Sequence, residues 1–103
     1  VTGELLDLPN PPTCILYPDD YAAIGGINEI RERGLRIPED ISIVGFDDTW
    51  ISTLTYPSIT TIHQPVQEMC EYAIEAIVKK VKSEKVPSQV VFPVELIDRE
   101  STK

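Results

Sequence analysis

The chain has 103 residues, 42% hydrophobic and 25% charged, proportions that are ordinary for a soluble globular domain. Its net charge of -8 and pI near 4.5 argue against direct nucleic-acid binding, because neutralising phosphates requires clustered Lys and Arg, and the nine present are scattered. No apolar run approaches the ~20 residues that span a bilayer, and no signal segment is recognisable, so we expect no membrane partner.

The cysteines and the lone methionine indicate what kind of chain this is. Cys14 lies in a predicted strand and Cys70 in a predicted helix, without the spacing of a metal site. We expect reduced, buried thiols of a cytosolic protein, with a disulfide as the alternative, and we expect no metal and no cofactor. The only methionine is Met69, and residues 1–8 resemble the last turns of a helix, so we expect a fragment of a longer protein.

The first half of the chain predicts a strand, a helix and a second strand. The short apolar run 13–17, which follows a proline-rich turn, is typical of a buried strand. Apolar residues recur at helical spacing over 21–33, and Gly34 can end that helix. The run 41–46 is apolar at both parities, which is typical of a strand buried on both faces of a parallel sheet. These three elements predict a βαβ unit of the α/β class.

Acidic residues follow both predicted strands. Asp19 and Asp20 come after the first, and Asp47 and Asp48 after the second. Since parallel strands end at one edge of a sheet, all four should lie near one another where open α/β sheets bind ligands. Such carboxylates can accept hydrogen bonds from the hydroxyls of a sugar. Four acids could alternatively bind Mg²⁺ for phosphoryl transfer, but no lysine or phosphate-binding glycine loop accompanies them.

Two features of the middle of the chain leave alternatives open. The Gly25-Gly26 pair suggests that another backbone approaches the helix closely, either the sheet beneath it or a partner helix. The apolar loop 49–58 either packs on its own domain or contacts another protein. The extended segment 59–65 contains His63, which we expect to be a solvated or hydrogen-bonded structural residue.

The last third predicts one long helix and an extended segment. The apolar stripe over 66–82 is strongly amphipathic, so its face should rest on a sheet or on another chain. Residues 88–97 predict an extended segment with Pro93 at an edge or bulge, and residues 98–103 form a polar tail.

Five stretches of the sequence form a specific succession, and the third is the longest. They are Pro12-Thr13 before the first strand, Asp19-Asp20-x-x-Ala23-x-Gly25, Gly34-Leu35-Arg36-Ile37-Pro38-Glu39-Asp40-Ile41-Ser42-Ile43-Val44-Gly45-Phe46-Asp47-Asp48, Pro57-Ser58-Ile59-Thr60-Thr61-Ile62-His63-Gln64-Pro65 and Arg99-x-Ser101-Thr102. This succession resembles the LacI–GalR family of bacterial transcription regulators. The resemblance runs from about Leu5 to the end, and its central block is highly specific. Periplasmic sugar-binding proteins share the fold but usually lack this block together with the Arg-x-Ser-Thr tail.

This resemblance implies the C-terminal portion of a two-lobed, periplasmic-binding-protein-like type I fold that holds an effector between its lobes. Residues 1–103 would form mostly the C-terminal lobe, the helix 66–82 would belong to the other lobe, and the DNA-binding headpiece is absent. The implied function is allosteric control of operator DNA by a homodimer that binds a sugar-like effector, without enzymatic activity. A periplasmic-type sugar-binding protein and a Mg-dependent phosphoryl-transfer enzyme are the alternatives.

The family's site residues carry over by position. Asp47 matches an effector-contacting aspartate, Asp19 occupies the place of a ligand-contacting asparagine, and Gln64 matches a crossover position lining the cleft. An acid in place of an amide loses two donors and gains a charge, so the ligand class does not carry over. We expect the apolar face of the long helix to be covered by self-association or by folding back onto the sheet. The dimer-interface candidates are Ile24, Ile27, Asn28, Trp50, Ile51 and Tyr56.

Overall fold

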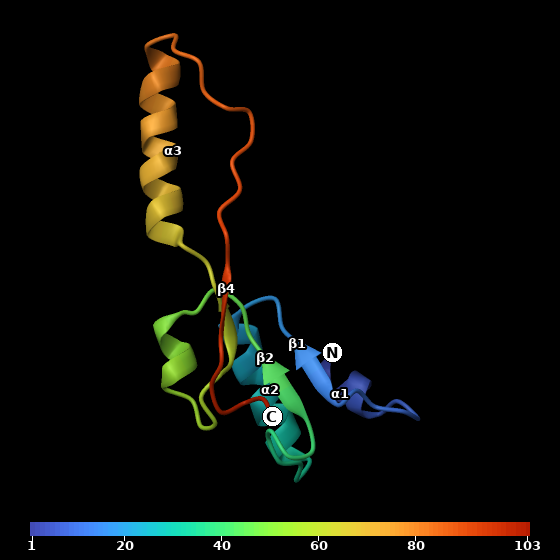
Figure 1. Cartoon of the computed structure of the whole chain (residues 1–103). Coiled ribbons are helices and arrows are strands. Elements are labelled where there is room, and N and C mark those ends of the chain that lie inside the picture. The colour runs from blue at the N-terminus through green and yellow to red at the C-terminus, as the bar shows by residue number, and fades with distance from the viewer. The chain divides into compact units, whose positions relative to one another are not determined.

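The computed structural model describes all 103 residues, which form two compact units (Figure 1). Unit 1 comprises residues 1–63 and 96–103, and unit 2 comprises residues 64–95. No helix is long and apolar enough to cross a membrane. The elements in chain order are α1 (Thr2–Leu6), β1 (Cys14–Leu16), α2 (Asp20–Glu32), β2 (Ser42–Val44), the 3-10 helix η1 (Trp50–Thr53), β3 (Thr61–His63), α3 (Val66–Val81) and β4 (Glu95–Ile97).

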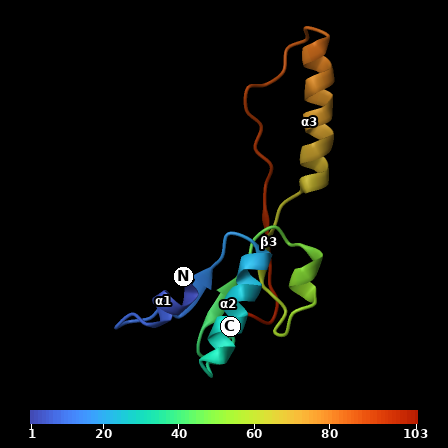
Figure 2. The same ribbon diagram turned by 180° about the vertical axis from the view of Figure 1, so that it is seen from behind.

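Unit 1 is built on the predicted βαβ arrangement, which confirms the α/β class. β1 and β2 pair in parallel, with Ile15 opposite Ile43, and α2 connects them (Figure 2). Each strand is shorter than its apolar run, because only the central residues of each run form the paired ladder. The parallel pairing fixes both carboxyl ends at one edge, which is the property on which the site depends.

The core of unit 1 lies between α2 and the strands. Ile30 and Ile43 are fully buried, and Ile27 is 2% exposed. Burying such a side chain contributes roughly 1.5–3 kcal/mol, so this cluster supplies much of the stability of the unit. The cluster consists of Ile15, Tyr17, Ala23, Ile27, Ile30, Ile41, Ile43 and Ile59.

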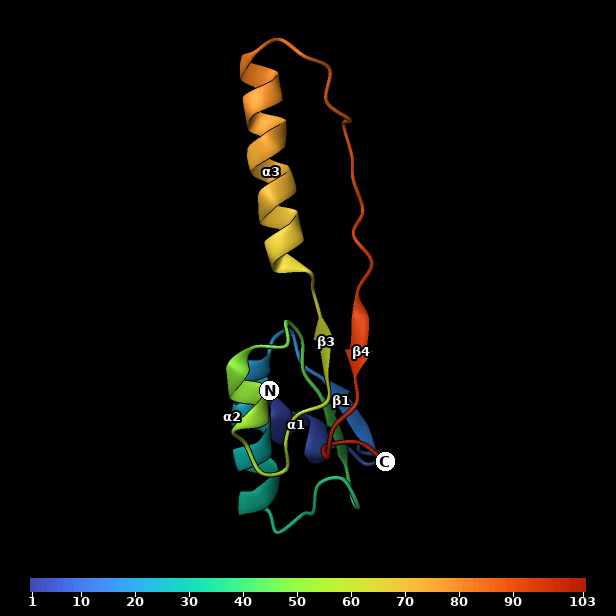
Figure 3. The ribbon, with the colours of Figure 1, turned by 60° about the vertical axis from the view of Figure 1, so that its left-hand side comes forward.

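The edge of β2 that faces away from β1 is covered by residues distant in sequence. Ile43 N donates to Ser101 O at 2.8 Å, and Gly45 N donates to Thr60 O at 2.8 Å. Ser101 Oγ donates to Ile43 O and accepts from Thr60 N. Beyond this point β3 pairs with β4 (Figure 3). The tail was expected to be merely polar, but Ser101 is fully buried because its hydroxyl completes the hydrogen bonding of this edge.

Two glycines in α2 have different surroundings. A Cβ at Gly26 would overlap the hydroxyl of Tyr17, whereas a Cβ at Gly25 would meet nothing. The predicted close approach therefore exists at Gly26 alone, and the neighbour is a buried tyrosine side chain rather than a backbone. Gly34, at φ +75°, follows the end of the helix in the left-handed conformation that glycine adopts readily.

Unit 2 consists of α3 and an extended return segment. The Phe92 ring from that segment contacts Tyr72 edge-on, with the ring centroids 5.8 Å apart. The helix forms as predicted, but no residue of α3 is buried, and Ile74 and Ile77 are each 63% exposed. Both cysteines are free, as expected, yet exposed rather than buried, because Cys14 is on the exposed face of β1, opposite to Ile15, and Cys70 is on this uncovered helix.

Candidate functional site

The carboxyl ends of β1 and β2 form a single rim. Tyr17 N donates to Val44 O at 2.8 Å, and Asp20 N donates to Phe46 O at 3.1 Å, so the two strands stay adjacent past their last ladder residues. The geometry that was predicted for Asp19 and Asp47 therefore holds at the level of the backbone. We refer to the segments 17–20 and 45–49 as the rim.

Asp19 and Asp47, the predicted ligand residues, are half-buried acids of this rim. Asp19 caps α2, because its Oδ1 accepts from Ala22 N at 2.7 Å, and the rest of its carboxylate can accept further hydrogen bonds. Asp47 has φ +92°, a conformation that aspartate tolerates better than most residues, and its backbone N donates to Ile62 O at 2.9 Å. Both carboxylates are thus held by fixed backbone.

Asp20 has a structural role that its sequence position did not reveal. Its carboxylate is fully buried and accepts three hydrogen bonds, from Thr49 N at 2.7 Å, Thr49 Oγ1 at 2.8 Å and Thr61 Oγ1 at 2.6 Å. A Cβ at residue 45 would overlap Asp20 Oδ1, so only glycine fits there. Asp20 therefore links the start of α2 both to the loop after β2 and to β3.

Asp48 is likewise held by other side chains of the protein. Its Oδ1 accepts from Arg99 Nη2 at 2.6 Å, and its Oδ2 lies 2.9 Å from His63 Nδ1. Arg99 Nη1 also donates to Ser52 Oγ and Ile59 O. His63 is thus a hydrogen-bonded structural histidine, which was one of the two predicted roles. The tail motif gave a signal for Arg99, but nothing local identified its partner.

Two of the four acids are bonded to protein groups. Asp20 and Asp48 direct their oxygens to protein donors, and no group of three His, Cys, Asp or Glu side chains is arranged to hold a metal ion. Gln64, the third predicted ligand residue, is half-buried and is the first residue of unit 2.

The candidate interface residues differ in their accessibility. Trp50 is 68% exposed and Tyr56 79% exposed, so this apolar loop does not bury its aromatic side chains within its own domain. Asn28 is also exposed, whereas Ile24 and Ile51 are half-buried. Ile27 is wrong as an interface residue, because it faces the core of unit 1, where it is 2% exposed.

The loop also exposes an apolar residue that was not among the interface candidates. Leu54, next to the 3-10 helix, is 69% exposed. Its position in the apolar run 49–58 was the available signal.

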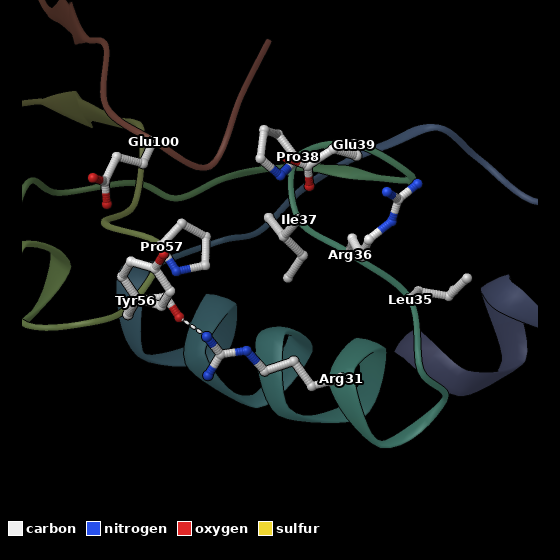
Figure 4. Close-up of a pocket in the computed structure, with 9 residues that line it drawn as sticks. All are labelled: Arg31, Leu35, Arg36, Ile37, Pro38, Glu39, Tyr56, Pro57 and Glu100. Carbon is white, nitrogen blue, oxygen red and sulfur yellow. Dashed lines mark hydrogen bonds between the residues drawn. The ribbon is translucent and has the colours of Figure 1, made fainter.

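A surface pocket of about 440 Å³ lies away from the rim, near the amino end of β2 (Figure 4). Its charged groups are mostly paired: Arg31 donates to Tyr56 O, and Glu100 accepts from Ser58 N and Oγ. Hydrogen bonds from Arg36 lower the pKa of Asp40 to about 2, and those from Ser58 lower the pKa of Glu100. These pairs stabilise the local loops and offer no convergent set of groups to a ligand.

Comparison with known proteins agrees with this geometry. The family described as "Periplasmic binding protein-like domain" matches residues 2–102. The HTH-type transcriptional repressor CytR of Escherichia coli K12 is 37% identical over 101 residues, 97% of this chain and 30% of the repressor. The crystal structure of the Lac repressor dimer bound to operator and the anti-inducer ONPF superposes with a TM-score of 0.90 at 33% identity, over 98% of this chain and 35% of the repressor chain.

A third relative was solved with a sugar. The periplasmic binding protein/LacI transcriptional regulator from Alkaliphilus metalliredigens QYMF, complexed with D-xylulofuranose, superposes with a TM-score of 0.81 at 36% identity, over 88% of this chain and 35% of the other. The chain thus spans about a third of the length of these relatives. It belongs to the LacI–GalR family of periplasmic-binding-protein-like transcriptional regulators.

Proposed function

We propose that this chain is the effector-sensing and dimerising part of a cytoplasmic transcription regulator, with no enzymatic activity of its own. The observation that carries the proposal is the rim, where two strand ends distant in sequence present Asp19 and Asp47 from adjacent, hydrogen-bonded backbone. The family relatives are repressors, and one was solved with both operator and a small ligand. Operator contact would come through a headpiece outside these residues.

The chemistry of the rim suits a ligand that is rich in hydrogen-bond donors. Carboxylates accept charge-assisted hydrogen bonds from vicinal hydroxyls, each contributing roughly 1.5–3 kcal/mol when shielded from water. A sugar-like metabolite fits this requirement, and a related regulator was solved with D-xylulofuranose. Gln64 would add an amide, because it directly follows the strand that pairs with the turn at Asp47.

Unit 2 would belong to the second lobe of the complete protein. Its helix α3 carries an apolar face with no buried residue, and such a face requires a covering surface. In a protein as long as the relatives, we assign the covering of this face to the part of the chain outside these residues. An effector that bridges both lobes would then shift their equilibrium between open and closed forms. The difference in effector affinity between those forms sets the size of the operator response.

Dimerisation would use the exposed loop and the adjacent surface of α2. Trp50 and Tyr56 are aromatic side chains of the kind that is enriched at interface centres, and the exposed Leu54 adds apolar area beside them. Asn28, Ile24 and Ile51 would complete the contact. The dimeric state of the related Lac repressor structures supports this assignment.

The test uses the intact regulator. A thermal-shift screen of sugars and nucleosides should find a stabilising ligand, and Asp47→Asn should lower its affinity at least ~10-fold, because one charge-assisted acceptor is lost. Operator affinity without ligand should stay unchanged. Asp40→Asn is the matched control, because Asp40 is paired with Arg36 at the opposite end of the strand. Equal ligand response in the Asp47 variant would remove this residue from the site.

A further inference from the structure

The chain passes between the two units twice. It leaves unit 1 after His63 at the end of β3, and it returns at Leu96 within β4. β3 and β4 pair with one another, so the outgoing and returning crossings lie side by side where they join unit 1 (Figure 3). Whatever fixes these two segments to unit 1 also fixes where both connections begin.

One carboxylate contacts a residue at each of the two crossings. Asp48 Oδ2 is 2.9 Å from His63 Nδ1, on the last residue before the outgoing crossing. Asp48 Oδ1 accepts from Arg99 Nη2 at 2.6 Å, two residues after β4 ends. The Asp48 and Arg99 side chains are only 18% and 17% exposed, so solvent screens this ion pair weakly.

The backbone at this point separates two neighbouring acids. Asp47 and Asp48 both have positive φ, +92° and +50°, which is rare for consecutive non-glycine residues. Two hydrogen bonds support the turn: Asp47 N donates to Ile62 O at 2.9 Å, and Asp48 N donates to Thr61 Oγ1 at 3.3 Å. The same turn therefore carries the rim acid Asp47 and the acid that fastens the crossings.

We propose that Asp48 is a positioning residue that fastens the outgoing and returning crossings to the turn carrying Asp47. The two crossings and that turn then move together as one rigid segment. Where the proposed effector site holds, a ligand on Asp47 acts on both connections to unit 2 through this adjacent residue. The proposal also gives the arginine of the Arg-x-Ser-Thr tail a role, since Arg99 is the returning half of the fastening.

Hydrogen–deuterium exchange of the intact regulator without effector tests the proposal. Asp48→Asn should raise amide exchange ~10-fold or more both at residues 62–65 and at residues 96–99, because one substitution weakens both charge-assisted contacts. Asp40→Asn removes an equally charged, Arg-paired carboxylate elsewhere in unit 1 and should leave both segments unchanged. Faster exchange in only one crossing, or in neither, would overturn the shared role.

A second variant decides the matter if Asp48→Asn does not fold. His63 has a 46% exposed side chain, so His63→Gln should preserve the fold. It should raise exchange at 62–65 by several-fold and leave 96–99 within about twofold, whereas Arg99→Lys should show the converse. Unchanged exchange at 62–65 in His63→Gln would contradict the proposal. This readout involves no effector, so it can fail or succeed independently of the proposed ligand function.

Discussion

The two long helices of this chain carry the same kind of sequence pattern, but only one of them buries its apolar face. In α2 the apolar stripe is buried, with Ala23 and Ile30 fully covered by the strands of unit 1. In α3 the stripe is at least as regular, yet Ile74 and Ile77 are each 63% exposed. Amphipathic periodicity thus indicates that a helix face needs cover, but not whether the cover is part of the same segment.

The largest expected contrast comes from truncating one isoleucine in each unit. Ile43→Ala should destabilise the 103-residue chain by ~2–5 kcal/mol, because it leaves a cavity in a fully buried site. Ile77→Ala should change stability by less than ~0.5 kcal/mol. Urea denaturation measures both. In a protein of the relatives' full length, Ile77→Ala should become costly if α3 is covered there, and an unchanged small effect would refute that cover.

The second largest loss of stability should come from removing a buried polar side chain of unit 1. Asp20→Ala leaves the donors on Thr49 and Thr61 without their acceptor, so we expect a loss of ~2–4 kcal/mol. Removing an exposed carboxylate of α3, as in Glu71→Ala, should cost under ~0.5 kcal/mol. Thermal unfolding of both variants measures the difference. A near-neutral Asp20→Ala would show that the buried network contributes little.

The adjacent glycines of α2 refine the comparison within a single helix. Gly26→Ala places a methyl group against the Tyr17 hydroxyl and should cost ~1–3 kcal/mol through overpacking. Gly25→Ala meets nothing and should stabilise by up to ~1 kcal/mol, through the better helix propensity of alanine. Opposite signs in denaturant titrations would confirm that only one face of the helix is in close contact. Equal signs would contradict it.

Acid should have the smallest effect, through exposed carboxylates of unit 1. Arg33 lowers the pKa of Asp7, and Arg36 lowers that of Asp40 to about 2. Since these folded-state values lie below those of the unfolded chain, their stabilisation is present above about pH 4 and is lost as the pH falls toward 2. The urea midpoint should therefore be lower at pH 2.5 than at pH 4.5, and the difference should be smaller in 1 M salt. A rising midpoint would reverse the sign.

The local sequence pattern was enough to predict the βαβ arrangement of unit 1. The β-branched runs and the helical spacing between them predicted parallel strands, and parallel strands place Asp19 and Asp47 at one edge. The local pattern was not enough to predict which acids are buried in structural hydrogen-bond networks. Asp19 and Asp20 are neighbours, but Asp19 is the extended cap residue and Asp20 begins the helix, so the first side chain bonds to the cap and the second points into the interior.

The remaining differences have the same origin in long-range contacts. Ile24 and Ile27 differ by one helical turn, and only the packed structure shows that the second faces the core. The tail was predicted only to be polar, because the partners of the Ser101 hydroxyl, Ile43 O and Thr60 N, lie far away along the chain. A single sequence contains no local signal for such a partner.

The burial of Ser101 has a consequence for synthesis. Ile43 and Ser101 are 58 positions apart, so this part of the far edge of β2 cannot pair until Ser101 itself has been translated. A contact between residues so far apart in sequence forms slowly during folding. During synthesis, the backbone N and O of Ile43 therefore stay without their final partner until Ser101 has left the ribosome and folded back onto β2.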